Sequence, residues 1–315
     1  MKNKKLWLGM LVMVLVFGMT VVGCGEEDGK TPFPTDGTLE EKLTWVSNGD
    51  NIEDGETYTI EVTADETISG HSISGSNLNN NITIVLKGIG AERKISFSDD
   101  STIRLSVGRN VTLVLDENIT LQGKSDSDSN FAPVSVSDGG VLEMKEGAKI
   151  IGHRTAGYGG GGVLVGGNGT FTMNGGTISG NTASGSSSYG GGGVYMGGGT
   201  FTMSGGTISK NTAVDHGGGV IVYSSSFNKT GGTITGYNSD TVNGNKARSS
   251  GYGHAVYAVL DVALIRNGLV LARIGIRPRK ENTAGPGVNL YCRYIGNTDA
   301  QTWSGEWDAV DMFEL

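Results

Sequence analysis

Cysteine, proline and basic residues are scarce in this sequence, and each shortage excludes a class of protein. Two cysteines in 315 residues cannot form a disulfide framework, so packing and backbone hydrogen bonds must hold the fold. The 54 glycines come with only 5 prolines and no Gly-X-Y period, which excludes collagen. The formal net charge of −8, without a basic stripe, argues against nucleic acid and anionic membrane surfaces as partners.

Long apolar runs are equally scarce, and the clearest one opens the chain. Residues 1–23 have a basic start, an apolar run from Leu6 to Val22 and a small residue before the cleavage position, as export signals do. The run ends in Val21, Val22, Gly23 and Cys24. This ending resembles the lipobox of bacterial lipoproteins, which implies that Cys24 is diacylated and becomes the N-terminal residue. An uncleaved transmembrane anchor is the alternative, because the run could just span a bilayer.

The anchor sets the expected location and the first domain boundaries. We expect a signal peptide over 1–23 and a flexible, acidic tether over 24–37. Acyl chains on Cys24 would then hold the protein in the bacterial envelope, at the outer membrane or the cell surface.

A short helix is expected directly after the tether. Thr38 to Glu41 has the form of a capping box, with threonine as N-cap and glutamate three residues later. Leu39, Leu43 and Val46 follow at the spacing of one helix face. A lone short helix is unstable in water, so we expect residues 38–54 to form a helix that caps a repeat domain, with a lead-in.

Residues 55–290 change to a period of two and contain one phrase written three times. It reads GGVLVGGNGTFTMNGGTISGNTA, then GGVYMGGGTFTMSGGTISKNTA, then a decayed GGVIVYSSSFNKTGGTITG. Each phrase offers three short strands and an apolar stripe that only stacked coils can bury. The sequence therefore predicts an all-β fold, a right-handed parallel β-helix (β-solenoid) of about eight coils. Residues 291–315 are expected to be its C-terminal cap or tail.

Stacking of the phrases predicts which side chains share a column. The expected inward columns are Val163/Val194/Val220, Val165/Met196/Val222, Phe171/Phe201/Phe227 and Ile178/Ile208/Ile234. Asn181 and Asn211 recur after the third strand, where stacked amides can bond along a column. Lys229 falls in the column of Met173 and Met203, which predicts a slipped register or an opened coil there.

Five segments carry a family resemblance. They are GTFTMSGGTIS, KNTA and GGGVY in the repeat, and the closing GHAVY (Gly253–Tyr257) and NTAGPGVNL (Asn282–Leu290). Together with the lipobox they resemble a family of bacterial surface lipoproteins with glycine-rich, pectin-lyase-like β-helix repeats, abundant in spirochaetes. The resemblance implies display on the cell surface, for which adhesion is the usual suggested role.

Candidate catalytic chemistry is confined to loops. Many β-helices cleave polysaccharides with clustered carboxylates. The loop carboxylates here are Asp99-Asp100, Asp126/Asp128 and Asp215-His216, and none recurs in adjacent coils, so a solvated turn is the ordinary interpretation. The alternative is a carbohydrate-active enzyme, a lyase or hydrolase, with Asp215, His216 and Asp240 as catalytic candidates beside an insertion at Tyr237–Asn243. His216 and His254 precede equivalent strands without a third ligand, so neither a metal site nor a cofactor is expected.

The expected surface feature is an exposed ridge of outward side chains. Tyr195, Ile221 and Tyr257 are its candidate ligand-binding residues, with Leu164 beside them, because tyrosine can stack on sugars or partner proteins. An outward threonine array, as ice-binding β-helices have, spans only two coils here, so ice binding is not favoured. We therefore expect a monomeric, lipid-anchored protein that binds a glycan or a host or surface protein, rather than an enzyme.

Overall fold

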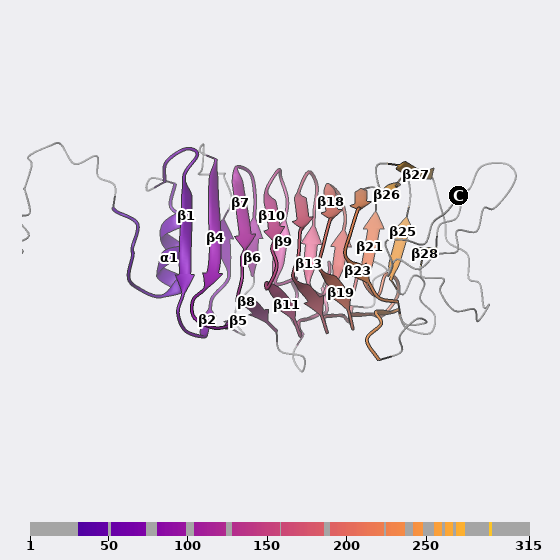
Figure 1. Cartoon of the computed structure of the whole chain (residues 1–315), viewed down its shortest axis with the longest axis horizontal. Coiled ribbons are helices and arrows are strands. Elements are labelled where there is room, and N and C mark those ends of the chain that lie inside the picture. Colours follow the sequence, from indigo (N-terminus) through magenta and orange to yellow (C-terminus); the bar gives the residue numbers. More distant parts are fainter. Residues whose placement is uncertain are drawn as a thin grey trace, which may run out of the picture. The chain divides into compact units, whose positions relative to one another are not determined.

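The computed structural model shows one short helix followed by stacked β-strands (Figure 1). Contacts divide the chain into Met1–Thr31 and Pro32–Leu315, and every element below belongs to the second unit. From residue 258 onward only the backbone is described. The described residues are 31–49, 52–73, 81–98, 104–123, 128–157, 159–185, 190–223, 225–236, 242–247, 255–259, 262–266, 269–274 and 290–291.

The strands form four sheets, and successive members of each sheet are a full coil apart in the chain, except for the last pair of sheet A. Sheet A contains β1 (Thr57–Val62), β4 (Ile82–Gly88), β7 (Val111–Leu115), β10 (Val141–Met144), β14 (Thr170–Met173), β18 (Thr200–Met203), β22 (Ser226–Lys229), β26 (Val262–Arg266) and β27 (Leu269–Ile274). Sheet B contains β2 (Glu66–Ile68), β5 (Arg93–Phe97), β8 (Ile119–Gln122), β11 (Lys149–Ile151), β15 (Thr177–Ser179), β19 (Thr207–Ser209) and β23 (Thr233–Ile234). Sheet C contains β3 (His71–Ile73), β6 (Leu105–Val107), β9 (Val134–Val136), β13 (Val163–Val165), β17 (Val194–Met196), β21 (Val220–Tyr223), β25 (Val256–Val259) and β28 (Leu290–Tyr291). Sheet D contains β12 (Arg154–Thr155), β16 (Thr182–Ala183), β20 (Thr212–Ala213) and β24 (Lys246–Ala247). This arrangement is a parallel β-solenoid, so the expected fold class is confirmed.

The number of regular coils is smaller than the eight expected, because sheet D has strands in only four of the coils. β27 turns back and pairs antiparallel with β26, which takes sheet A out of the parallel order at this end. Only Asn267 and Gly268 separate the two strands, and Asn-Gly is the strongest short-range hairpin signal. The expected count extended the coil period through this segment and missed that signal.

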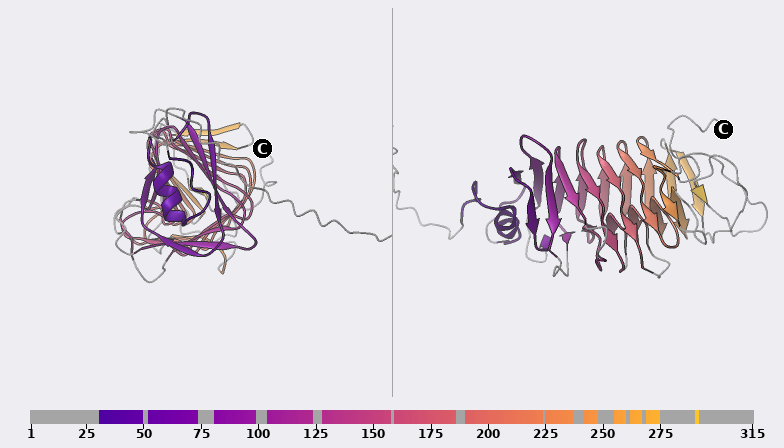
Figure 2. Two further views of the ribbon diagram at one scale, coloured as in Figure 1. Left: turned by 90° about the vertical axis from the view of Figure 1, so that its left-hand side faces the viewer. Right: turned by 90° about the horizontal axis from the view of Figure 1, so that it is seen from below.

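Helix α1 (Leu39–Val46) caps the first coil as expected. Thr38 and Glu41 form the full capping box, and the Glu41 N–H donates to Thr38 Oγ1. Leu39, Leu43 and Val46 are buried, and the helix contacts β1, β2 and β3. In the left view of Figure 2 the helix lies across the end of the coils, which keeps the terminal coil from exposing its apolar interior.

The segment before the helix is attached to this cap. Phe33 packs against Trp45 and Tyr58, with ring centroids 5.2 Å and 5.5 Å away. The chain is therefore held to the cap from Phe33 onward, before residue 37, where the flexible tether was expected to end.

The predicted inward columns are confirmed strand by strand. Phe171, Phe201 and Phe227 are in register, fully buried and stacked, with successive ring centroids 4.5 Å and 4.9 Å apart. The valine, methionine and isoleucine columns pair in the expected register as well. Parallel strands lie about 4.8 Å apart, so identical flat rings in one column can stack face to face.

A column of buried amides runs beside the isoleucine column. Asn211 Nδ2 donates to the Ile178 carbonyl (2.9 Å) and to Asn245 Oδ1 (2.8 Å). Asn211 Oδ1 accepts from the main-chain N–H and from Nδ2 of Asn181, both at 3.0 Å. The predicted amide stacking is thus confirmed, and Asn245 extends it by one coil.

His153 takes the first place in this amide column. Its main-chain N–H donates to Asn181 Oδ1 (3.0 Å), and its Nε2 lies 3.1 Å from the Leu121 carbonyl oxygen. Asn181 Nδ2 makes the equivalent bond to Ile150 (2.9 Å) one coil later. Burial lowers the pKa of His153 to about 3, which keeps the ring neutral, and the bond to Leu121 requires the proton on Nε2.

The register does not slip at Lys229 and the coil does not open there, so that prediction was wrong. Lys229 pairs with Met203 in continuous register, and its side chain is 3% exposed. Nζ donates to the carbonyl of Gly232 (2.7 Å), in a turn where that glycine has a φ of +70°. The turn carbonyl supplies the partner that a buried ammonium needs, and the coil keeps its geometry.

The outward threonine array on sheet A is two coils tall as expected, because Val141 and Glu143 precede it in register and Ser226 and Asn228 follow it. One outward column continues in register from β1 to β22 as Thr57, Thr83, Thr112, Val141, Thr170, Thr200 and Ser226. The earlier coils do not repeat the phrase but place similar residues in the same column. Short β-branched residues suit a solvated strand, which accounts for the array without a ligand.

Candidate functional site

Several predicted site residues lie outside the described part of the chain. They are the lipobox residues Val21, Val22 and Gly23, the anchor residue Cys24, the catalytic candidate Asp240, and Asp99, Asp100, Asp126 and His254. The roles predicted for these residues stay predictions.

The outward column of sheet C contains the predicted ligand-binding residues. The register pairs Tyr195 with Ile221 and Ile221 with Tyr257, and Leu164 precedes them. Toward α1 the same column continues as Ser135, Ser106 and Ser72. The column therefore changes from serine to large apolar and aromatic residues along the solenoid.

Two members of this column are covered, which corrects the expectation of an exposed ridge. Ile221 is 0% exposed and Tyr257 is 3% exposed. The loop that leads into β21 lies over them: a Cβ on Gly217 would be 2.7 Å from Ile221 Cβ, and the His216 ring stacks on Tyr257 at 4.4 Å between centroids. Period-two alternation predicts the direction of a side chain but not the loop that covers it.

Tyr195 stays partly exposed and is joined by Tyr223, which was not among the residues predicted from the sequence. Their ring centroids are 5.8 Å apart, and the ring planes are inclined by 41°. The Tyr195 ring lies against Gly197, where a Cβ would be 2.8 Å from Cε1 of the ring. We call Tyr195, Tyr223 and Gly197 the tyrosine platform. Tyr223 could have been found, because it lies two residues after Ile221 and so faces the same side of the strand.

A main-chain turn borders the tyrosine platform. A Cβ on Gly198 would lie 2.8 Å from the Cα of Gly167, so the turn at Gly166–Gly169 packs directly against the turn of the next coil. Gly167 and Asn168 are exposed, and a Cβ on Gly167 would meet nothing within 4 Å. The two rings therefore stand beside a surface built from main chain and free of bulky side chains.

Asp215 and His216 lie in the loop that covers the start of β21. Burial lowers the pKa of His216, although the charge of Asp215 and a hydrogen bond to its main chain oppose the shift. The ring is consequently neutral near pH 7, which suits its stacking on Tyr257. The structure thus brings His216 to the ligand-binding candidates and gives it a packing role.

The remaining described carboxylate candidate is engaged in an ion pair. Asp128 Oδ1 lies 2.6 Å from Arg154 Nε and accepts from Ser184 Oγ at 2.7 Å. Among the residues that the structure describes, no three His, Cys, Asp or Glu side chains gather as metal ligands would. None of the described helices is both long enough and apolar enough to cross a membrane.

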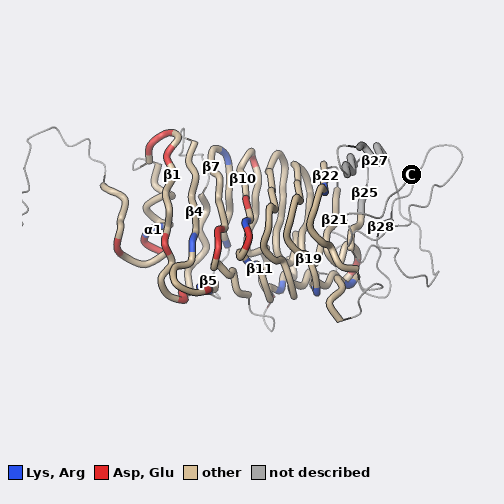
Figure 3. The backbone as a smooth tube through the Cα atoms, viewed as in Figure 1, with Lys and Arg blue, Asp and Glu red and all other residues tan. Residues whose placement is uncertain are grey.

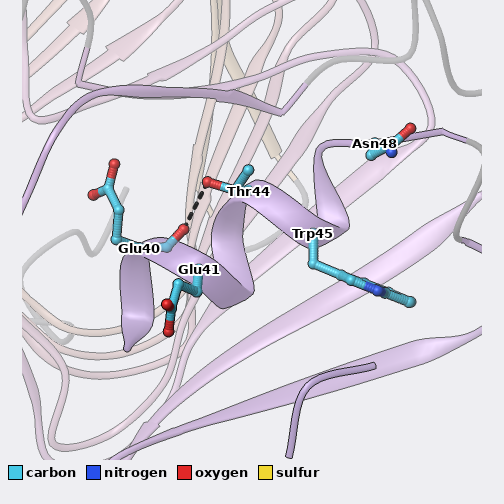
Figure 4. Close-up of a pocket in the computed structure, with 5 residues that line it drawn as sticks. All are labelled: Glu40, Glu41, Thr44, Trp45 and Asn48. Atoms are coloured by element: carbon cyan, nitrogen blue, oxygen red, sulfur yellow. Dashed lines mark hydrogen bonds between the residues drawn. The ribbon is translucent and has the colours of Figure 1, made fainter. Parts of the chain in front are cut away.

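Two shallow hollows lie away from the tyrosine platform. One, of about 380 Å³, is lined by Glu40, Glu41, Thr44, Trp45 and Asn48 on the outer side of α1 (Figure 4). Its two carboxylates already serve the fold, because Glu41 closes the capping box and Glu40 accepts from the Ser69 N–H (2.8 Å). The other, of about 220 Å³, lies along turns and strand starts of the first coils, including Asn81, Asn110 and Gly139.

Comparison of the chain with protein-family models, with curated proteins and with solved structures gives no match.

Proposed function

We propose that this protein is a lipid-anchored binding protein of the bacterial envelope, and that it holds its ligand on the tyrosine platform without catalysis. The observation that carries the proposal is the pairing of two partly exposed tyrosines from adjacent coils beside a glycine turn. Tyrosine offers a large, rigid and amphipathic contact area at a small cost in side-chain entropy.

Binding on this surface would use the faces of the two phenol rings. The apolar face of a sugar ring, or an apolar side chain of a partner protein, can lie on each ring. Gly197 adds no side chain beside Tyr195, so a flat ligand can reach the ring and the main chain together. A role in adhesion or surface display, as in the pectin-lyase-like surface lipoproteins that the sequence resembles, is consistent with such a platform.

The fold uses the candidate base, His216, as a packing residue, and this favours a binding role over catalysis. His216 packs on Tyr257, and burial lowers its pKa. A direct check is incubation of the protein with a panel of acidic polysaccharides. Turnover that is lost in Asp215→Asn would contradict the binding proposal and support the carbohydrate-active enzyme.

The lipid anchor is the second part of the proposal and rests on the sequence around Cys24. A cysteine after an apolar run and a small residue is the position at which bacterial lipoproteins are diacylated, and two acyl chains give stable membrane attachment. Palmitate labelling in the producing bacterium should mark the wild-type protein and be lost in Cys24→Ser. Labelling that persists in the variant would refute the anchor.

The platform is tested by an array of glycans and extracellular proteins probed with the full chain. We expect a ligand whose affinity falls about tenfold or more in Tyr195→Ala and in Tyr223→Ala, since each change removes one stacking surface. Ser72→Ala, on the same face of the same sheet four coils away, is the matched control and should bind normally. Binding that survives both tyrosine variants would show that the platform is not the site.

A further inference from the structure

Tyr195 and Gly197 of the tyrosine platform lie in a stretch of the chain that carries no charge. From Thr155 to Ser209 the sequence contains no Asp, Glu, Lys, Arg or His. This stretch supplies β13 to β19 and the loops on both sides of β13 and β17, hence Tyr195 and Gly197. Figure 3 shows its backbone without the red and blue of the neighbouring coils. A stretch of this length without a charged side chain is unusual in a chain of which 18% is charged.

Two aspartates lie in turns at the two ends of this part of sheet C. The Asp138 N–H donates to the Gly167 carbonyl (2.8 Å), which places this aspartate in the turn next to the glycine surface. Asp215 lies in the loop at the opposite end of β21. Of the cations in neighbouring coils, Arg154 pairs with Asp128, and Lys229 is buried.

We infer that the ligand of the tyrosine platform is an uncharged polysaccharide, an inference that rests on the proposed binding function. Recognition of a carboxylate or sulfate normally uses arginine or lysine, in charge-assisted and often bidentate hydrogen bonds. The stretch from Thr155 to Ser209, which carries Tyr195, supplies no such group, and the aspartates at the two ends would repel an anionic chain. A neutral sugar needs only stacking on the rings and uncharged hydrogen bonds, which the exposed Asn168 amide and the turn main chain can provide.

The same surface offers a steric test that leaves the fold intact. A Cβ on Gly167 meets no atom within 4 Å, and this glycine is not among those with positive φ. Gly167→Trp should therefore fold normally and place an indole where the ligand would lie. Ser72→Trp puts the same side chain on an exposed position of the same sheet and serves as the matched control. Gly167→Lys adds a cation at the point where the wild type has none.

The experiment is titration of the full chain with neutral oligosaccharides and with carboxylated oligosaccharides of the same backbone and length, at low and at high salt. We expect at least about tenfold tighter binding of the neutral form, nearly independent of salt because no ion pairs are involved. Gly167→Trp should lose this binding and Ser72→Trp should keep it, while Gly167→Lys should bind the carboxylated form more tightly than the wild type does.

Two outcomes would overturn the inference and can be told apart from failure of the binding function. Tighter binding of the carboxylated form, weakened by salt and by Tyr195→Ala, would keep the binding site but reject an uncharged ligand. A protein ligand that depends on Tyr195, with no glycan bound, would reject the polysaccharide and likewise keep the site. If no ligand depends on Tyr195 or Tyr223, the proposed function itself fails.

Discussion

Replacing His153 with asparagine should make the protein more resistant to acid. The pKa of His153 is about 3 in the folded protein, because the ring is buried, against about 6.5 in an unfolded chain. The unfolded state therefore binds the proton more readily, and stability that is fully present above pH 6.5 is lost as the pH falls toward 3. Asparagine does not titrate, and at 181, 211 and 245 it already makes the bond that His153 makes to Leu121.

The expected magnitude follows from the interval between the two pKa values. A pH of 5.0 is about 1.5 units below the pKa of the unfolded histidine, so the unfolded histidine is protonated, whereas the folded ring is still neutral. Each unit is worth about 1.4 kcal/mol, so the wild type should lose about 2 kcal/mol relative to pH 7.5 through this residue alone. His153→Asn should not show this loss. Hydrogen bonds from Lys149 and Thr120 lower the pKa of Glu92, and the stability linked to that shift is lost mainly below pH 4.5, so it disturbs the comparison little.

The assay is urea unfolding followed by circular dichroism, for both proteins at pH 7.5 and pH 5.0. If the variant and the wild type lose stability equally between the two pH values, within about 0.5 kcal/mol, the reasoning about His153 is wrong. His153→Gln is a second non-titrating variant that can also reach the Leu121 carbonyl. Its agreement with His153→Asn would show that removal of the titrating ring, and not a change in packing, protects against acid.

Three further changes test other parts of the structure. Asn211→Ala should lower the free energy of unfolding by about 3 kcal/mol, because its buried partners in the amide column lose their bonds, and a loss below about 1 kcal/mol in urea unfolding would contradict this. Lys229→Met should raise the thermal midpoint by about 2 °C or more, because a buried amine is replaced by the residue of its column; a lower midpoint would show that the bond to Gly232 outweighs the cost of burial. Thr38→Ala should cost the cap about 1 kcal/mol, seen as faster amide hydrogen exchange in α1, and unchanged exchange would mean that the capping box with Glu41 is not needed.

The interior of the solenoid was predictable because its sequence is periodic. A phrase that recurs at the length of one coil fixes which residues stack, so the phenylalanine, isoleucine and asparagine columns followed from alignment alone. The capping helix followed from local rules, since a capping box and the spacing of one helix face involve neighbouring residues only. The hairpin at β26 and β27 was also marked, by Asn267-Gly268, but the expected period obscured it.

The surface was less predictable because coverage depends on loops that do not repeat. The register of Ile221 and Tyr257 was predicted correctly, yet their burial follows from the path of the loop at His216 and Gly217. Tyr195 can pair with Tyr223 because β21, which ends at Tyr223, is one residue longer than its equivalents β13 and β17. His153 was overlooked as a member of the amide column because histidine and asparagine share no obvious sequence pattern, although both can donate to the same carbonyl.

The unbroken register between β14 and β18 has a consequence for how such a chain can change in length. Each residue of one phrase lies beside its equivalent in the next, so duplication or loss of a whole phrase would join matching edges and leave every column intact. Point changes alter this surface one residue at a time, whereas such an event moves the tyrosine platform relative to α1 by one strand spacing, about 4.8 Å. The distance along the solenoid between the tyrosine platform and α1 can therefore change in steps of one coil, when near-identical segments recombine.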